Sequence, residues 1–325
     1  MATTITSTEL DFQDIKSNLK VFFKQEAAFT DYNFEGSGLN SLLDVLSYNT
    51  QFSGLIANFA LNESYLGTAQ LRNSVVSLAE TLGYIPGTRN SSQSTIGLTI
   101  NPAVGQSLDE TYSFQPGEVV LRGSIDGDVY TFTNRKTLTA DAQGTNIYTF
   151  RPFDDPDASI IVYEGEERQQ QYLVDGSENA LYVIPDQNID ASTAIIKVYK
   201  DPGVSATGVG AYTVYNNIFD VSSITDTSTL YVLRESPNQF YELTFGAFNA
   251  LGIAPIAGNV VDVNYLRASG TTANGISTFR LISTLKLGDY IVNPDEVTIT
   301  TLTTSAGGTD KEDIESIRKK APFQY

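Results

Sequence analysis

Two consecutive stretches decide the fold of this chain: FEGSGLNSLLDVLSYNTQF at residues 34–52 and TAQLRNSVVSLAETLGYIP at residues 68–86. Each begins with residues typical of a helix start and continues with apolar residues at the helical spacing of three and four. After Pro86 the chain changes to short β-forming runs that are separated by Gly, Asn, Asp and Pro. We therefore expect an α+β fold, in which a helical bundle segment precedes antiparallel β domains and a further helix starts near residue 325.

Three helices are expected in the helical segment that precedes Pro86. The first begins at Asp11, a residue type that caps helices, and should end by about residues 29–31. The second covers about residues 38–63. The third is expected to be capped by Thr68 and to stop at Gly83, because a glycine readily adopts the backbone conformation that ends a helix.

The second helix carries an apolar stripe so broad that it indicates contact on more than one side. Asn40, Asp44 and Asn49 interrupt the stripe, and each of them either needs a polar partner or marks the register of a helix bundle. The two readings left open are a core shared by the three helices and an interface with other chains. For the reading as an interface with other chains, ten residues form the predicted helical-bundle interface: Leu42, Leu43, Leu46, Phe52, Leu55, Ile56, Phe59, Leu71, Val75 and Leu78.

The β-rich body is expected to be an antiparallel sandwich or meander, because apolar and polar residues alternate along short runs. Turn signals stand between neighbouring runs, for example at Pro116-Gly117 and Asp126-Gly127. The predicted strands cover residues 95–100, 128–133, 146–150, 159–163, 171–174, 181–184, 195–199, 229–233, 240–245, 260–266, 279–285 and 296–303.

Four domains follow from this reading: a helical head at 1–90, β-rich domains at 91–200 and 201–305, and the start of a C-terminal helical or α+β domain at 306–325. A glycine-rich loop marks the boundary near residue 201. In the last segment Asp310 is expected to cap a helix over residues 311–318 that has almost nothing to pack against. We therefore expect the natural protein to continue beyond residue 325.

Composition excludes several classes of site. The 325 residues include no cysteine and no histidine, so disulfides, thiolate zinc sites, Cys nucleophiles and Ser-His-Asp triads are ruled out. The net charge is −18, and residues 101–300 carry 25 Asp and Glu against 11 Lys and Arg. Such a surface repels nucleic acid and either keeps the chain solvated or docks a basic partner. No signal peptide or run of about 18 apolar residues is present, so we expect cytoplasmic synthesis and no membrane span.

Acidic clusters are the remaining candidates for chemistry. The Asp residues at 126–128 and 154–157 could offer oxygen ligands to calcium, but neither cluster has EF-hand spacing, and Asp is common in turns. Glu164, Glu166 and Glu167 could supply paired carboxylates for glycoside hydrolysis, but they surround Gly165, where a hairpin turn is expected. We therefore predict no catalytic residue, no cofactor and no metal site.

Three motifs then point to a family. The segments DYNFEGSGLNSLLDVLSYNTQF and NESYLGTAQLRNSVVSLAETLGYIP resemble the N-terminal region of baseplate wedge proteins of T-even-like contractile-tailed phages, within the baseplate J-like family. The stretch that begins YELTFGAFNALG at residue 241 is similar to the family's FGDGxxG region, although residues 247–249 replace its Asp-Gly and make it one residue longer. GGTDKEDIESIRKKAP at 307–322 resembles the GGxDxEDxExIRxxAP signature.

This resemblance implies a structural subunit of the virion tail baseplate, assembled in the host cytoplasm, rather than an enzyme. Its implied partners are a second copy in a different conformation, another baseplate wedge protein, neighbouring wedges in a sixfold ring and sheath-initiating baseplate proteins. The implied role is to form the ring around the hub and to relay host contact to sheath contraction by conformational change. The alternative is a receptor- or carbohydrate-binding β protein of a tail fibre.

Overall fold

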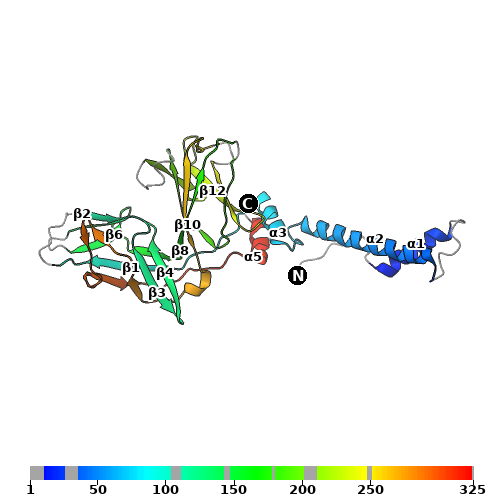
Figure 1. Ribbon diagram of the computed structural model, residues 1–325, viewed down its shortest axis with the longest axis horizontal. Coiled ribbons are helices and arrows are strands. Elements are labelled where there is room, and N and C mark those ends of the chain that lie inside the picture. The colour runs from blue at the N-terminus through cyan, green and yellow to red at the C-terminus, as the bar shows by residue number, and fades with distance from the viewer. Residues whose placement is uncertain are drawn as a thin grey trace. The chain divides into compact units, whose positions relative to one another are not determined.

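The computed structural model describes residues 11–25, 36–103, 111–142, 147–177, 180–200, 211–246 and 251–323 (Figure 1). It divides into two compact units, Met1–Pro86 together with Asp313–Tyr325, and Gly87–Glu312. Helices fill the first unit, and β-sheets that are antiparallel except at one pair fill the second, so the predicted α+β class is confirmed.

The first two helices of the helical unit lie side by side (Figure 1). In α1 (Phe12–Lys24) the Asp11 side chain accepts hydrogen bonds from the backbone N–H groups of Gln13 and Asp14, which confirms the predicted cap. The predicted end of α1 at 29–31 lies outside the described residues. The helix α2 (Gly38–Glu63) has the predicted bounds, and an ion pair between Lys16 of α1 and Asp44 of α2 joins the two helices.

The start of α3 (Arg72–Thr81) differs from the prediction. The N-cap is Leu71, not Thr68, and the Thr68 hydroxyl instead donates a 2.7 Å hydrogen bond to the carbonyl of Asn62. A carboxylate from the end of α2 satisfies the free N–H groups, since Glu63 accepts from Gln70 at 2.8 Å. The end is as predicted, because Gly83 has a φ of +80° and its N–H bonds to the Glu80 carbonyl.

The last helix, α5 (Ile314–Lys320), starts later than predicted. Its N-cap is Asp313, which accepts from the Ser316 N–H at 2.7 Å, so the prediction of Asp310 as the cap is wrong. The helix also has a partner within the chain. Ile317 is fully buried against α3 in a small core, where Val75 and Ala79 are fully buried too. The expectation that this helix packs against almost nothing is therefore wrong, and a short 3₁₀ turn, η4 (Ala321–Phe323), follows it.

The first sheet of the β unit has nine strands in the order β15-β3-β4-β7-β1-β6-β5-β2, with β18 also paired to β1. Its strands share one core that is built on large side chains such as Phe132, Phe150 and Tyr148. The strands are β1 (Gln93–Ile100), β2 (Thr111–Phe114), β3 (Val120–Ile125), β4 (Asp128–Asn134), β5 (Leu138–Asp141), β6 (Tyr148–Pro152), β7 (Ile160–Glu164), β15 (Phe279–Leu281) and β18 (Val297–Thr301).

The second sheet has seven strands in the order β8-β14-β10-β11-β12-β13-β9 and a core of its own. All of its pairs are antiparallel except β11 with β12, which are parallel. The strands are β8 (Glu166–Leu173), β9 (Tyr182–Ile184), β10 (Ile189–Tyr199), β11 (Tyr212–Asn217), β12 (Leu230–Glu235), β13 (Tyr241–Phe245) and β14 (Val260–Arg267). Smaller elements are the pair β16 (Lys286–Leu287) and β17 (Tyr290–Ile291) and the 3₁₀ turns η1 (Ile218–Asp220), η2 (Gly270–Ala273) and η3 (Pro294–Glu296).

The two sheets do not divide at the expected boundary near residue 200. The chain leaves the first sheet at Gly165, builds the second sheet with residues 166–267, and then returns to the first sheet at β15. The chain therefore crosses from one sheet to the other at Gly165, which has a φ of +143°. The prediction of a hairpin turn at this position is wrong. A loop rich in glycine marks a break in the local pattern, but pairing between distant strands decides which sheet a strand joins.

Candidate protein–protein interface

One side of α2 is apolar and exposed to solvent. Eight of its large apolar side chains are between 41% and 65% exposed: Leu42, Val45, Leu46, Tyr48, Phe52, Leu55, Ile56 and Phe59. Isolated exposed apolar residues are normal on a protein surface, whereas a contiguous group marks a site of association. This group, which we call the exposed face of α2, runs along most of the helix.

The buried side of α2 has the opposite character. Its buried residues are Asn40, Leu43, Ser47, Gly54, Asn58 and Asn62, of which only one has a large apolar side chain. Several of these polar groups bond back to the helix itself, as when the Ser47 hydroxyl donates to the Leu43 carbonyl at 2.7 Å. A surface helix normally turns its apolar side inward. The polarity of α2 is inverted: among the described residues its apolar side stays exposed, whereas apolar side chains elsewhere form cores.

The predicted interface residues fall into two groups in the structure. Seven of them are exposed, namely Leu42, Leu46, Phe52, Leu55, Ile56, Phe59 and Leu71. Leu43 and Val75 are fully buried within the chain, and Leu78 is partly buried against the core that α3 and α5 share. Those three residues therefore stabilise the helical unit itself, and we leave them out of the interface proposed below.

Sequence reasoning missed two members of the exposed face, Val45 and Tyr48. Val45 is three residues after Leu42, and this spacing alone could have shown that the two side chains share one side of the helix. Tyr48 follows Leu46 by two residues and widens the face rather than extending it. The spacing could have shown its position as well, because Tyr48 precedes Phe52 by four residues and Leu55 by seven.

The two charged residues of α2 both interact with groups outside the exposed face. Asp44 pairs with Lys16, and Glu63 accepts hydrogen bonds from the backbone N–H groups of Gln70 and Leu71. Burial alone would raise the pKa of Glu63, but these bonds, a hydrogen bond from Ser74 and the nearby charge of Arg318 lower it. The exposed face therefore offers uncharged apolar contact and no ionic attraction.

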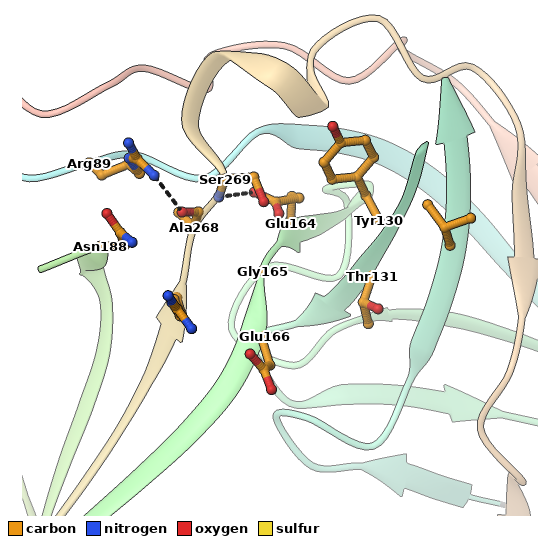
Figure 2. A pocket seen from close by; sticks show the side chains of 11 residues that line it. Arg89, Tyr130, Thr131, Glu164, Gly165, Glu166, Asn188, Ala268 and Ser269 are labelled. Carbon is orange, nitrogen blue, oxygen red and sulfur yellow. Dashed lines mark hydrogen bonds between the residues drawn. The ribbon is translucent and has the colours of Figure 1, made fainter. Parts of the chain in front are cut away.

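The glutamates near residue 165 do not form a paired-carboxylate site. Glu164 and Glu166 lie where the chain crosses between sheets, and both line a cavity of about 640 Å³ (Figure 2). Glu164 is buried and accepts a 3.1 Å hydrogen bond from the Ser269 N–H. Glu166 pairs with Arg168 at 2.8 Å, and Glu167 pairs with Arg135 at 3.3 Å. Each carboxylate thus has a separate structural partner.

The cavity itself is lined by two arginines, Arg89 and Arg267, and two glutamates, Glu164 and Glu166. Arg89 lies 3.3 Å from Asp310 and donates to the Ala268 carbonyl at 3.4 Å, as Figure 2 shows in part. Among the described residues no group of three or more Asp or Glu is arranged to hold a metal ion. In the same part of the chain no helix is long and apolar enough to cross a membrane.

Comparison with known proteins now identifies the helical region. Residues 11–84 match the family described as baseplate wedge protein gp6-like, helical domain. The whole chain is 30% identical over 326 residues to the baseplate wedge protein gp6 of Enterobacteria phage T4.

That alignment covers 95% of this chain and 46% of the phage T4 protein, so the chain spans about half the length of its relative. The resemblance to baseplate wedge proteins is thereby confirmed. The region that matches the gp6-like helical domain contains α1, α2 and α3, and thus the whole exposed face of α2.

Proposed function

We propose that this chain is a structural subunit of a phage tail baseplate wedge and that it joins its partners through the exposed face of α2. The observation that carries the proposal is the inverted polarity of that helix inside a gp6-like helical domain. Apolar surface of this extent is stabilised when other helices cover it, as happens in helix bundles. The helical unit thus supplies the assembly contact, and the β unit supplies the body of the subunit.

The finer features of the proposal rest on the resemblance to the wedge family. The partners are a second copy of this chain in a different conformation and a helix of another wedge protein, within a sixfold ring around the hub that also meets sheath-initiating proteins. The ring relays host contact to sheath contraction by switching between two packings, and interface energy decides between them. This mechanism needs no catalytic step, which fits a chain without cysteine or histidine.

The test is the mass of the natural-length protein by light scattering, alone and co-expressed with the neighbouring wedge proteins. We expect a stable complex with two copies of this chain, and we expect Leu46→Asp or Leu55→Asp to abolish it. Both side chains are largely exposed, so neither change removes core packing from the chain alone. Each change places a charge where the partner would have to bury it, which is costly.

The matched control is Leu173→Asp, because Leu173 is 65% exposed on β8 and lies outside the helical domain. This variant should assemble like the unchanged protein. Assembly that survives both changes in α2 would contradict the proposal. A monomer in every mixture would favour the tail-fibre alternative, and binding of host glycans would then be tested.

A further inference from the structure

The structure separates the three polar residues that interrupt the stripe of α2. Asn40 is buried near the start of the helix, and Asp44 pairs with Lys16. Asn49 is different, because it lies exposed on the same side of the helix as the apolar residues. No described residue forms a hydrogen bond with its side-chain amide. Only Asn49 thus remains available to a partner on the exposed face.

The position of Asn49 in the spacing of that face is informative. Six residues follow one another at alternating steps of three and four, which is the a and d pattern of a coiled coil: Leu42, Val45, Asn49, Phe52, Ile56 and Phe59. We call these six residues the seam. All are exposed, and Asn49 is the single polar member. The side of α2 that is buried within the chain lies opposite the seam.

The positions that flank the seam cannot select a partner by charge. In coiled coils the e and g positions usually carry the ionic pairs that set partner choice and orientation. Here the flanking residues are Ser41, Leu46, Tyr48, Ser53, Leu55 and Ala60, none of which is charged. Apolar contact is not directional and tolerates sliding of one helix along another. Among the six seam residues themselves, only Asn49 forms directional hydrogen bonds through its side chain; the hydroxyls of Ser41, Tyr48 and Ser53 lie beside the seam.

We propose that Asn49 fixes the register of the helix bundle and selects helices that present an amide or hydroxyl side chain at the same level. This inference rests on the proposed assembly through α2. In the correct register the partner side chain satisfies the buried amide. After a slip of one heptad, Asn49 would take the level of Leu42 or Ile56, and its amide would be left without a hydrogen-bond partner among apolar side chains, which is unfavourable.

The experiment compares Asn49→Val with Thr50→Val in the full chain co-expressed with its wedge partners. Thr50 is exposed but lies outside the seam, so it provides the same gain in apolar character at the next residue. We expect the Asn49→Val complex to survive a higher denaturant concentration and to lose its single mass, because several registers become equally favourable. The Thr50→Val complex should keep the mass and the denaturant midpoint of the unchanged protein.

A second measurement reads the register directly. The chain contains no cysteine, so Val45→Cys provides a unique attachment point for a photo-crosslinker. Cross-links mapped by mass spectrometry should reach one position on each partner helix, and addition of Asn49→Val should spread them to positions about seven residues away. If the complex forms and Asn49→Val leaves both mass and cross-links unchanged, the role of Asn49 is overturned. If the unchanged chain forms no complex, it is the proposed assembly that fails.

Discussion

The β unit buries its large apolar side chains, whereas α2 exposes most of its own. In the β unit large side chains such as Phe132, Phe150 and Tyr241 are at most 2% exposed, and each sheet surrounds a core of its own. In α2 the two phenylalanines, Phe52 and Phe59, are about half exposed, while asparagines lie on the buried side. In the part of the chain that the structure describes, the β unit thus closes its own cores, whereas α2 leaves its apolar side exposed.

This difference shows where the information for assembly resides. A core that is closed within one chain resists change because each side chain fills a volume that its neighbours define. An exposed apolar helix gains that kind of packing only when another chain covers it. Substitutions in the two regions should therefore fail in different measurements, the first in stability of the chain alone and the second in assembly.

The largest expected difference in the free energy of unfolding is between Phe132→Ala and Phe52→Ala. Removal of the fully buried Phe132 side chain should lower the free energy of unfolding by about 3–5 kcal/mol, since a cavity remains in the core. Phe52 is 52% exposed, so its removal should change the stability of the chain alone by less than about 0.5 kcal/mol. Denaturant unfolding of the isolated chain measures both. If both substitutions lowered the free energy of unfolding equally, α2 would be covered within the chain, and the contrast between α2 and the β unit would not hold.

Gly308→Ala tests whether the β unit depends on close packing of its C-terminal segment. A Cβ atom there would lie 2.3 Å from both the Gly270 carbonyl oxygen and the Ser92 hydroxyl. The crowding should destabilise the β unit by about 1–3 kcal/mol, because overpacked sites force the backbone to shift. At Gly87 an added Cβ would meet nothing closer than 3.7 Å, so Gly87→Ala is the control and should be nearly neutral. Thermal unfolding of the two variants distinguishes these outcomes.

Local rules predicted much of this fold because they depend on neighbours in the sequence. Asp11 caps α1, α2 has the expected bounds, and the alternating run at 95–100 lies within β1. The failures occur where distant residues compete. The carboxylate of Glu63, seven residues before Gln70, accepts a hydrogen bond at the start of α3, where Thr68 was expected to cap the helix.

The candidate interface was predictable as a set of residues but not as a surface. Helical spacing identified the apolar residues of α2 and α3, yet it could not tell which of them would be buried within the chain. That choice depends on helix packing, which buries Leu43 completely and leaves the adjacent Leu42 53% exposed. The crossover at Gly165 was missed for a similar reason, since strands that resemble a hairpin in sequence belong to two different sheets.

Arg135→Ala tests how the two sheets of the β unit are held together. The Arg135 side chain is only 6% exposed and donates hydrogen bonds to the carbonyls of Thr193 at 2.6 Å and Asn264 at 3.2 Å, both in the second sheet. Burial lowers the pKa of this guanidinium, while Glu167 opposes the decrease. Because the substitution leaves carbonyl groups without these donors, we expect a loss of about 2 kcal/mol.

The adjacent Lys136 is the matched control for Arg135. Its ion pair with Asp154 at 2.7 Å is more than half exposed on both sides, so Lys136→Ala should cost less than about 0.5 kcal/mol. Urea midpoints of the two variants provide the measurement. If both variants unfold at the same midpoint, Arg135 does not join the sheets in the way proposed.

Glu164→Gln should give the smallest effect, and its dependence on pH carries the information. Burial raises the pKa of Glu164 above its ordinary value of 4.5 and Asp190 adds to the increase, while the Ser269 hydrogen bonds and Arg89 partly offset it. A carboxyl whose pKa is raised by folding binds its proton more tightly in the folded state, so stability falls as pH rises from about 4.5 through the folded pKa. Glutamine cannot ionise and can still accept the Ser269 N–H. The variant should therefore gain stability relative to the unchanged protein between pH 4 and pH 7 in denaturant unfolding, whereas a relative loss over that range would show that the ionised carboxylate stabilises the crossover between the sheets.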